Sequence, residues 1–140
     1  MKYLLDTNIV SEVGKARPHP GVVKWLSDTD AMQTCIASVT IGEITYGIAR
    51  APTDERKVQL RTWFTTVKRN YANRILTLNE ETFETWGTLY GEAENRGRPV
   101  EMLDVMIAAT ASQHNLIVVT RNIAHFKELP VKLFNPWLEE

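Results

Sequence analysis

The chain has 140 residues, long enough to bury a hydrophobic core without disulfide or metal cross-links, and we expect one domain over residues 1–140. Hydrophobic residues make up 44% and charged residues 24%, with a net charge of −1, which excludes a disordered chain and a membrane-embedded one. The first apolar run is too short for a secretory signal, so we expect a cytoplasmic location.

The first predicted strand ends at a carboxylate. Tyr3-Leu4-Leu5 is a short apolar run, typical of a strand buried on both faces of a parallel sheet, and Thr7 and Asn8 are common at helix starts. Asp6 therefore falls at the carboxyl end of the strand, where ligands of open α/β sheets bind. Two interpretations stay open: Asp6 binds a hard cation, or it merely caps the next helix.

Short apolar runs alternate with helical repeats along the rest of the chain. We predict three further strands, at residues 34–37, 75–78 and 116–119. We predict helices at residues 7–13, 20–27, 38–50, 54–72, 80–95 and 102–114, and a short one that holds His125 and Phe126. This alternation indicates an α/β fold with a central, mainly parallel sheet of four to five short strands, on which the apolar tail docks.

Charge is unevenly distributed along the chain. Residues 50–74 hold seven Lys and Arg against two acids, a net charge of +5, and residues 80–104 hold seven acids against two Arg, a net charge of −5. The predicted helix at 54–72 is thus a candidate phosphate-tracking surface, although a solvated helix face gives the same counts. Its candidate phosphate contacts are Arg56, Lys57, Arg61, Lys68 and Arg69.

Two more acids occupy positions similar to that of Asp6. Glu43 follows the second predicted strand, and Asp104 begins a later helix, so both should reach the same edge of the sheet as Asp6. Clustered carboxylates repel one another unless a cation or proton lies between them, and Mg²⁺ or Mn²⁺ prefers oxygen ligands. Alternatives stay open here too: Glu43 follows Thr40 at capping-box spacing, and the helix dipole favours an acid at Asp104.

Four stretches of the sequence resemble, in order and spacing, the four sequence blocks of PIN-domain proteins. They are LLDTN (4–8), SVTIGE (38–43), LDVMIAATA (103–111) and TRNIAHF (120–126). Within that family the chain is most similar to the VapC and FitB type, which are the toxin halves of type II toxin–antitoxin pairs. The tail FNPW (134–137) also resembles FitB-like members.

This resemblance implies a three-layer α/β/α PIN-like fold and an endoribonuclease that depends on Mg²⁺ or Mn²⁺. It implies that Asp6, Glu43 and Asp104 hold the metal while water attacks an RNA phosphodiester in line. Asn122 stands where many members carry Asp, which predicts one firmly held metal and a second that arrives with the substrate. Three polar side chains would orient the carboxylates: Thr7, Asn8 and Thr120.

The resemblance also implies partners. Proteins of this type form homodimers and are held inactive by a small DNA-binding antitoxin, VapB- or FitA-like, whose C-terminal segment lies in a groove near the acids. The apolar early helices, which include Trp25, are expected to supply that groove. The cations of the predicted helix at 54–72 become candidate RNA contacts.

Other functions fit the sequence less well. A haloacid dehalogenase-type phosphatase needs a second Asp where Asn8 stands, and a receiver domain needs paired acids and a late lysine that the chain lacks. One alternative keeps the fold without the enzyme: a metal-dependent RNA-binding or DNA-associated PIN module with little turnover, which the neutral Asn122 favours.

The histidines and the lone cysteine do not form a recognisable zinc site. His19, His114 and Cys35 lack zinc-ligand spacing, and we expect Cys35 to be a small core residue. His125 is either a general base or a structural, capping residue, and the sequence favours the structural role.

Overall fold

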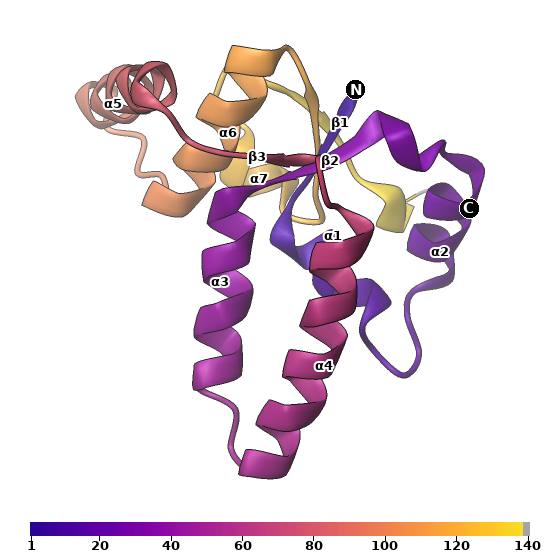
Figure 1. The fold of residues 1–140 in the computed structure, drawn as a ribbon. Coiled ribbons are helices and arrows are strands. Elements are labelled where there is room, and N and C mark those ends of the chain that lie inside the picture. The colour runs from indigo at the N-terminus through magenta and orange to yellow at the C-terminus, as the bar shows by residue number, and fades with distance from the viewer. Residues whose placement is uncertain (139–140) are drawn as a thin grey trace.

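A sheet of five parallel strands forms the centre of the protein in a computed structural model that describes residues 1–138. The strand order is β3-β2-β1-β4-β5, with β1 in the middle (Figure 1). The strands are β1 Tyr3–Leu5, β2 Thr34–Ala37, β3 Ile75–Leu76, β4 Ile117–Val119 and β5 Lys132–Phe134. The predicted parallel sheet is confirmed, and the apolar tail supplies its fifth strand.

Helices connect successive strands, as predicted. They are α1 Thr7–Val13, α2 Pro20–Asp28, α3 Ser38–Ala49, α4 Asp54–Asn70, α5 Glu80–Asn95, α6 Met102–His114 and α7 Ile123–Phe126, with short 3-10 turns η1 Ala31–Gln33 and η2 Pro136–Leu138. Local capping explains several of their ends. The Thr53 side chain accepts the backbone N–H of Arg56 at the start of α4, and Asn79 forms a reciprocal capping box with Thr82 at the start of α5.

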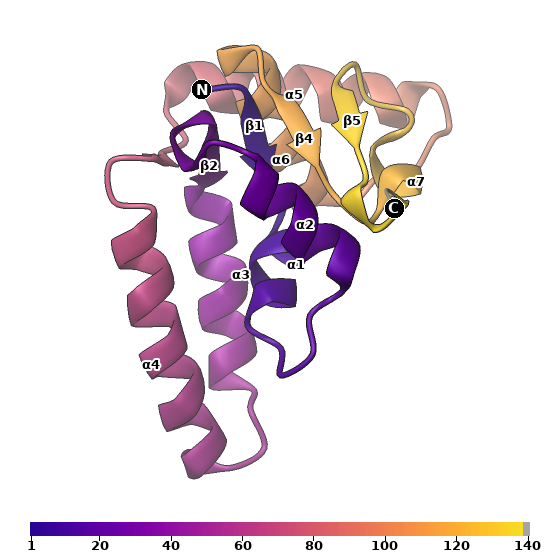
Figure 2. The ribbon, with the colours of Figure 1, turned by 90° about the vertical axis from the view of Figure 1, so that its right-hand side faces the viewer.

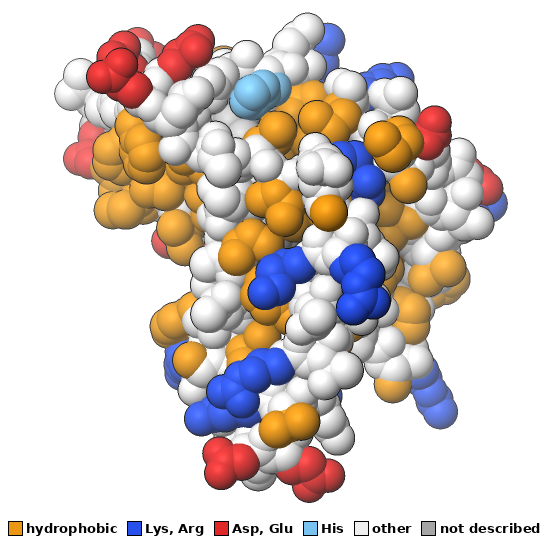
Figure 3. All heavy atoms as spheres, in the orientation of Figure 1, with side chains coloured by type: hydrophobic (Ala, Val, Ile, Leu, Met, Phe, Trp, Pro, Cys, Tyr) orange, Lys and Arg blue, Asp and Glu red, His pale blue; other side chains and the backbone are white. Residues whose placement is uncertain are grey.

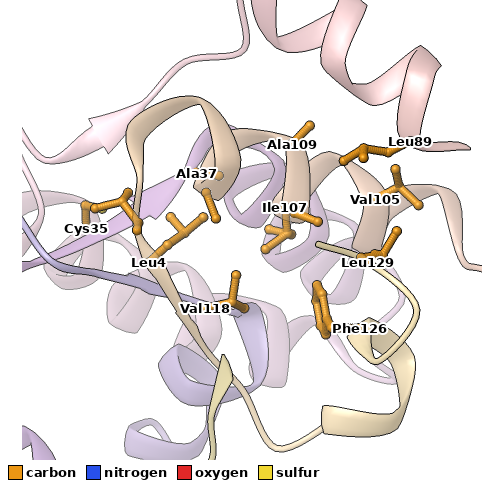
Figure 4. Close-up of a cluster of buried hydrophobic side chains, with 13 residues drawn as sticks. Leu4, Cys35, Ala37, Leu89, Val105, Ile107, Ala109, Val118, Phe126 and Leu129 are labelled. Carbon is orange, nitrogen blue, oxygen red and sulfur yellow. The ribbon is translucent and has the colours of Figure 1, made fainter. Parts of the chain in front are cut away.

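Two hydrophobic clusters cover the two faces of the sheet and produce three layers. Neighbouring strand residues point to opposite faces, because side chains alternate along a strand. On one face, Leu4 and Val118 pack with residues of α5, α6 and α7, and Figure 4 shows them converging with Ile107 and Phe126. On the other face, side chains of β1, β2 and β4 pack against α1, α2, α3 and α4. Burial on both faces explains why the strands read as apolar runs.

Helices α3 and α4 form an antiparallel pair that projects beyond the sheet (Figures 1 and 2). Phe64 and Val67 bury one side of α4 against the rest of the protein, and most of its other residues are exposed. The pair therefore exposes a long helical surface on one side of the sheet's carboxyl edge. Across residues 1–138, none of the helices has the length and apolar content needed to cross a membrane.

Candidate active site

Asp6 lies at the point where the strand order changes direction. The chain runs from β1 outward to β2 on one side, while β4 pairs with β1 on the other, and such switch points are where open α/β sheets bind ligands. The Asp6 Oδ1 atom accepts the backbone N–H of Thr7 at 2.8 Å, so Asp6 does cap α1. Its Oδ2 atom accepts the Thr120 hydroxyl at 2.8 Å and the Asn8 amide at 3.2 Å. Capping therefore occupies only one oxygen of this buried carboxylate.

Thr7 connects Asp6 to Glu43. The Thr7 hydroxyl lies 2.7 Å from Glu43 Oε1 and 3.0 Å from the Thr40 hydroxyl, which brings the first two sequence blocks together. The capping-box interpretation of Glu43 is wrong, because α3 already begins at Ser38 and has no side-chain cap. Thr40 itself is a buried neighbour of the site that the sequence identified only as a helix-capping residue.

Asp104 lies in the first turn of α6 and contacts a histidine. Its Oδ2 atom is 3.2 Å from His125 Nδ1, with 18% of the Asp104 side chain and 52% of the His125 side chain exposed. The His125 ring therefore contacts one of the acids, and its role, as a general base or as a structural residue, stays a prediction. The sequence offered no signal for this contact, which crosses from α6 to α7.

The three acids have raised pKa values for related reasons. Burial is the main cause for Asp6, and it outweighs the hydrogen bonds from Thr120, Thr7 and Asn8 that favour the charged form. Burial also raises the pKa of Glu43, to which the charges of Asp6 and Asp104 add. Burial and the Asp6 charge raise the pKa of Asp104, while His125 opposes the shift. The acids therefore lie close enough to repel one another.

Asn8, Thr120 and Asn122 surround Asp6 in one hydrogen-bonded network. The Thr120 oxygen accepts the Asn8 amide at 3.2 Å and the Asn122 backbone N–H at 2.9 Å. The Asn122 carboxamide makes no hydrogen bond to another residue of the described chain, and the residue is half-buried at the start of α7. Its oxygen is therefore available to an additional ligand beside Thr120.

The donor set suits a hard cation. Carboxylate and amide oxygens at one edge of the sheet are the ligands that Mg²⁺ and Mn²⁺ prefer. In this arrangement, however, no three His, Cys, Asp or Glu side chains among residues 1–138 converge closely enough to hold a metal together. Binding by all three acids therefore requires side-chain movement, which a cation would favour by removing their repulsion.

The candidate phosphate contacts lie on α4. Figure 3 shows Lys and Arg side chains over the α3–α4 pair, whereas acidic side chains gather on α5. Successive helix residues turn by about 100°, so Lys57, Arg61 and Lys68 share a stripe roughly 40° wide, and Arg56 and Arg69 lie outside it. We name these three residues the α4 stripe. The Lys68 ammonium also lies 4.8 Å from the Phe64 ring centre.

The antitoxin groove expected on the early helices stays a prediction, and Trp25 itself packs against other residues of the chain. Trp25 packs edge-on against Tyr3, with ring centres 5.1 Å apart, and against Phe134 at 5.5 Å, so the chain's own tail covers it. A pocket of about 230 Å³ lies beside Glu43 and is lined by Thr7, Ser11, Glu43, Ile44, Gly47, Ile48, Leu60 and Trp63. A second pocket of about 190 Å³ shares Leu60 and Trp63 with it and reaches Arg56. We name the two together the α4 groove.

Comparison with known proteins places these features in a family. The PIN domain family model matches residues 3–132. The toxin FitB of Neisseria gonorrhoeae is 32% identical over 135 residues, covering 96% of this chain and 97% of FitB. The VapC ribonuclease Y4jK of Sinorhizobium fredii is 29% identical over 136 residues, covering 96% of each chain.

Solved structures of toxin–antitoxin complexes are also similar to this chain. A crystal structure of FitAcB from Neisseria gonorrhoeae superimposes with a TM-score of 0.90 at 31% identity, covering 97% of this chain and 99% of the other. VapBC2 from Rickettsia felis, bound to a DNA fragment from its promoter, superimposes with a TM-score of 0.82 at 26% identity, covering 96% and 98%. The likeness spans all four sequence blocks and the complete sheet. The chain therefore belongs to the PIN domain family.

Proposed function

We propose that this protein is an endoribonuclease and acts as the toxin of a toxin–antitoxin pair. One observation carries the proposal: at the switch point of the sheet, Thr7 contacts both Asp6, through its backbone N–H, and Glu43, through its hydroxyl. The names of the relatives support the same class, since they are a toxin, FitB, and a ribonuclease, VapC.

The acids would hold Mg²⁺ or Mn²⁺, with Asp6, Glu43 and Asp104 as ligands and Asn122 as a weaker neutral one. Such an ion would neutralise the acids, lower the pKa of the attacking water and stabilise negative charge on the phosphoryl oxygens. The hydroxyls of Thr7 and Thr120 orient two of these carboxylates, and His125 contacts the third. Each acid thereby keeps a defined position at the edge where RNA would bind.

The direct test is incubation of the purified protein with RNA, with and without Mg²⁺ or Mn²⁺. We expect cleavage only when the ion is present, and none from Asp104→Asn under the same conditions. RNA that is bound but left intact by the wild-type protein would favour the alternative, a PIN module with little turnover. Cleavage that persists in EDTA would contradict the metal-dependent mechanism.

The α4 groove is our proposed site for the antitoxin. It begins at Thr7 and Glu43 and continues past Leu60 and Trp63, so an apolar segment lying in it would also cover Glu43. Expression of this protein alone should therefore arrest growth. Co-expression with a small DNA-binding antitoxin should restore growth and yield a complex, and harmless expression of active protein alone would contradict the toxin assignment.

We propose the apolar face between α3 and α6 as the homodimer interface. A cavity of about 540 Å³ on this face is lined mainly by apolar residues, and Tyr46, Met102 and Leu103 nearby are between 45% and 62% exposed. Exposed apolar patches of this kind mark contact surfaces. Leu103→Glu should then shift the protein from dimer to monomer in sedimentation, whereas a dimer that resists this change would place the interface elsewhere.

A further inference from the structure

The backbone of Arg121 lies next to the hydrogen-bonded network around Asp6. Arg121 follows Thr120, whose hydroxyl contacts Asp6. The Arg121 backbone N–H donates to the Asn8 side-chain oxygen at 3.2 Å, and its carbonyl accepts the Asn135 amide at 3.5 Å. The backbone of Arg121 is thus held between the first sequence block and the tail.

The tail also holds the Arg121 side chain. The guanidinium carbon lies 5.7 Å from the Trp137 ring centre, within the range of a cation–π contact. Trp137 is fixed in turn, because its backbone N–H donates to Asn135 Oδ1 at 2.9 Å and its ring faces that of His19, with centres 6.4 Å apart. The FNPW tail therefore does more than complete the sheet: it forms a platform under an arginine.

The Arg121 guanidinium remains available to a ligand. The residue is exposed and takes part in none of the ion pairs formed within residues 1–138, although its charge contributes to the lowered pKa of Glu12. Its planar group has donors arranged to grip a phosphate with two hydrogen bonds, and stacking on Trp137 reduces the conformational freedom lost on binding. RNA also needs such a cation here, since the three acids repel its phosphates.

We propose that Arg121, stacked on Trp137, binds an RNA phosphate next to the one that is cleaved. This inference rests on the proposed function and adds a substrate-binding residue to it. Arg121 contacts the phosphate directly, and Trp137 acts as a positioning residue. The bound phosphate would place the neighbouring phosphodiester over Asp6, whose Oδ2 atom accepts the hydroxyl of Thr120, the residue before Arg121.

The test measures RNA binding without cleavage. Fluorescence anisotropy with a labelled single-stranded RNA of about 12 nucleotides, in EDTA and over a range of salt, gives the affinity and its salt dependence. Arg121→Gln should weaken binding about 10- to 100-fold, as expected when a hydrogen bond to a charged group is lost. It should also flatten the log–log salt slope by about 0.7. Arg121→Lys should restore the slope but only part of the affinity.

Two further variants separate position from charge. Trp137→Leu should keep the salt slope while lowering the affinity several-fold, because the charge stays but its platform is lost, and thermal unfolding will show whether this variant is folded. Lys132→Gln is the matched control, since Lys132 is an exposed cation at the opposite end of β5, and its affinity and slope should equal those of the wild type.

The outcomes separate this inference from the proposed function. Arg121→Gln with unchanged affinity and slope, or wild-type binding too weak to detect, would overturn the inference even if the wild type cleaves RNA. A weakened Arg121→Gln in a wild type that does not cleave RNA would support phosphate binding and overturn the nuclease. Equal losses in Arg121→Gln and Lys132→Gln would also overturn the inference, since they would show general attraction to positive charge.

Discussion

Two carboxylates six residues apart have pKa values that are shifted in opposite directions. Asp6 and Glu12 are each only 5% exposed, at the two ends of the β1–α1 segment. The pKa of Asp6 is raised by burial, whereas the pKa of Glu12 is lowered by its hydrogen bonds to Lys15 and to the His19 backbone, at 2.8 and 2.9 Å. Burial alone therefore does not distinguish a structural carboxylate from a functional one.

The difference lies in the partner. Glu12 forms an ion pair with Lys15, which compensates its charge, and it accepts the His19 backbone N–H, which fixes the loop before α2. Asp6 accepts only neutral hydroxyl, amide and backbone donors and faces two other acids. A buried carboxylate whose negative charge is only partly balanced favours the binding of a cation. Acids with shifted pKa values in such places mark functional sites. The variants below test whether this contrast separates activity from stability.

The largest expected effect is loss of cleavage at the acids. Asp6→Asn and Asp104→Asn should each lower the rate of RNA cleavage by at least about 10³-fold, because removing a metal ligand costs several kcal/mol of transition-state stabilisation. Glu43→Gln should be nearly as damaging. Single-turnover cleavage of a labelled RNA measures this. A variant that cleaves like the wild type would remove that residue from the site.

Glu12→Gln should show the opposite pattern. It should lower the free energy of unfolding by about 1–3 kcal/mol, because the Lys15 ammonium and the His19 backbone N–H lose a charged acceptor, while folded protein still cleaves RNA. Urea denaturation measures the stability. The control is Lys15→Gln, whose side chain is 57% exposed and should change stability by less than about 1 kcal/mol. Equal stability of Glu12→Gln and the wild type would show that Glu12 does not have the structural role that distinguishes it from Asp6.

Asn122→Asp tests whether the acids around Asp6 bind a cation. A fourth charge beside Thr120 should tighten metal binding roughly 10-fold, which corresponds to the attraction of charges a few ångströms apart in water-rich surroundings. It should also lower the Mg²⁺ concentration for half-maximal cleavage. Calorimetric titration of both proteins measures this. Two equally tight sites in the wild type, or an unchanged metal requirement, would show that Asn122 does not contact the ion.

The cations of the α4 stripe extend the comparison to charges that form no ion pair within residues 1–138. If the α4 stripe tracks RNA phosphates, each of Lys57→Gln, Arg61→Gln and Lys68→Gln should flatten the salt slope of RNA binding by about 0.7 and weaken all RNAs alike. Arg69→Gln, which lies off the stripe, is the control. Unchanged slopes would identify the stripe as a solvated helix face.

The smallest effects should appear in the pH dependence of stability. Because their pKa values are raised, Asp6, Glu43 and Asp104 bind more protons in the folded protein than in the unfolded chain. Their contribution to the free energy of unfolding therefore falls as pH rises from about 4 through the raised values. Glu12 acts in reverse, and its contribution is lost as pH falls below 4.5 through its lowered value. In EDTA, Asp104→Asn should reduce the first loss and Glu12→Gln the second, in unfolding titrations. Parallel pH profiles for both variants would contradict the opposite shifts.

The sequence by itself determined the strand pattern, the helix starts and the four blocks. These features are local: side-chain alternation, capping residues such as Thr53 and Asn79, and the carboxylate at the end of β1 depend on neighbours within a few positions. They sufficed to predict the α/β sheet and to bring Asp6, Glu43 and Asp104 toward one edge.

Only the tertiary structure decided which groups touch. The contact between His125 and Asp104, the Thr7 bridge to Glu43 and the stacking of Arg121 on Trp137 join residues 16 to 36 positions apart. Likewise, Trp25 packs against Phe134 from the other end of the chain. Such contacts depend on how helices pack across the sheet, and the spacing of residues along the chain carries no record of that packing.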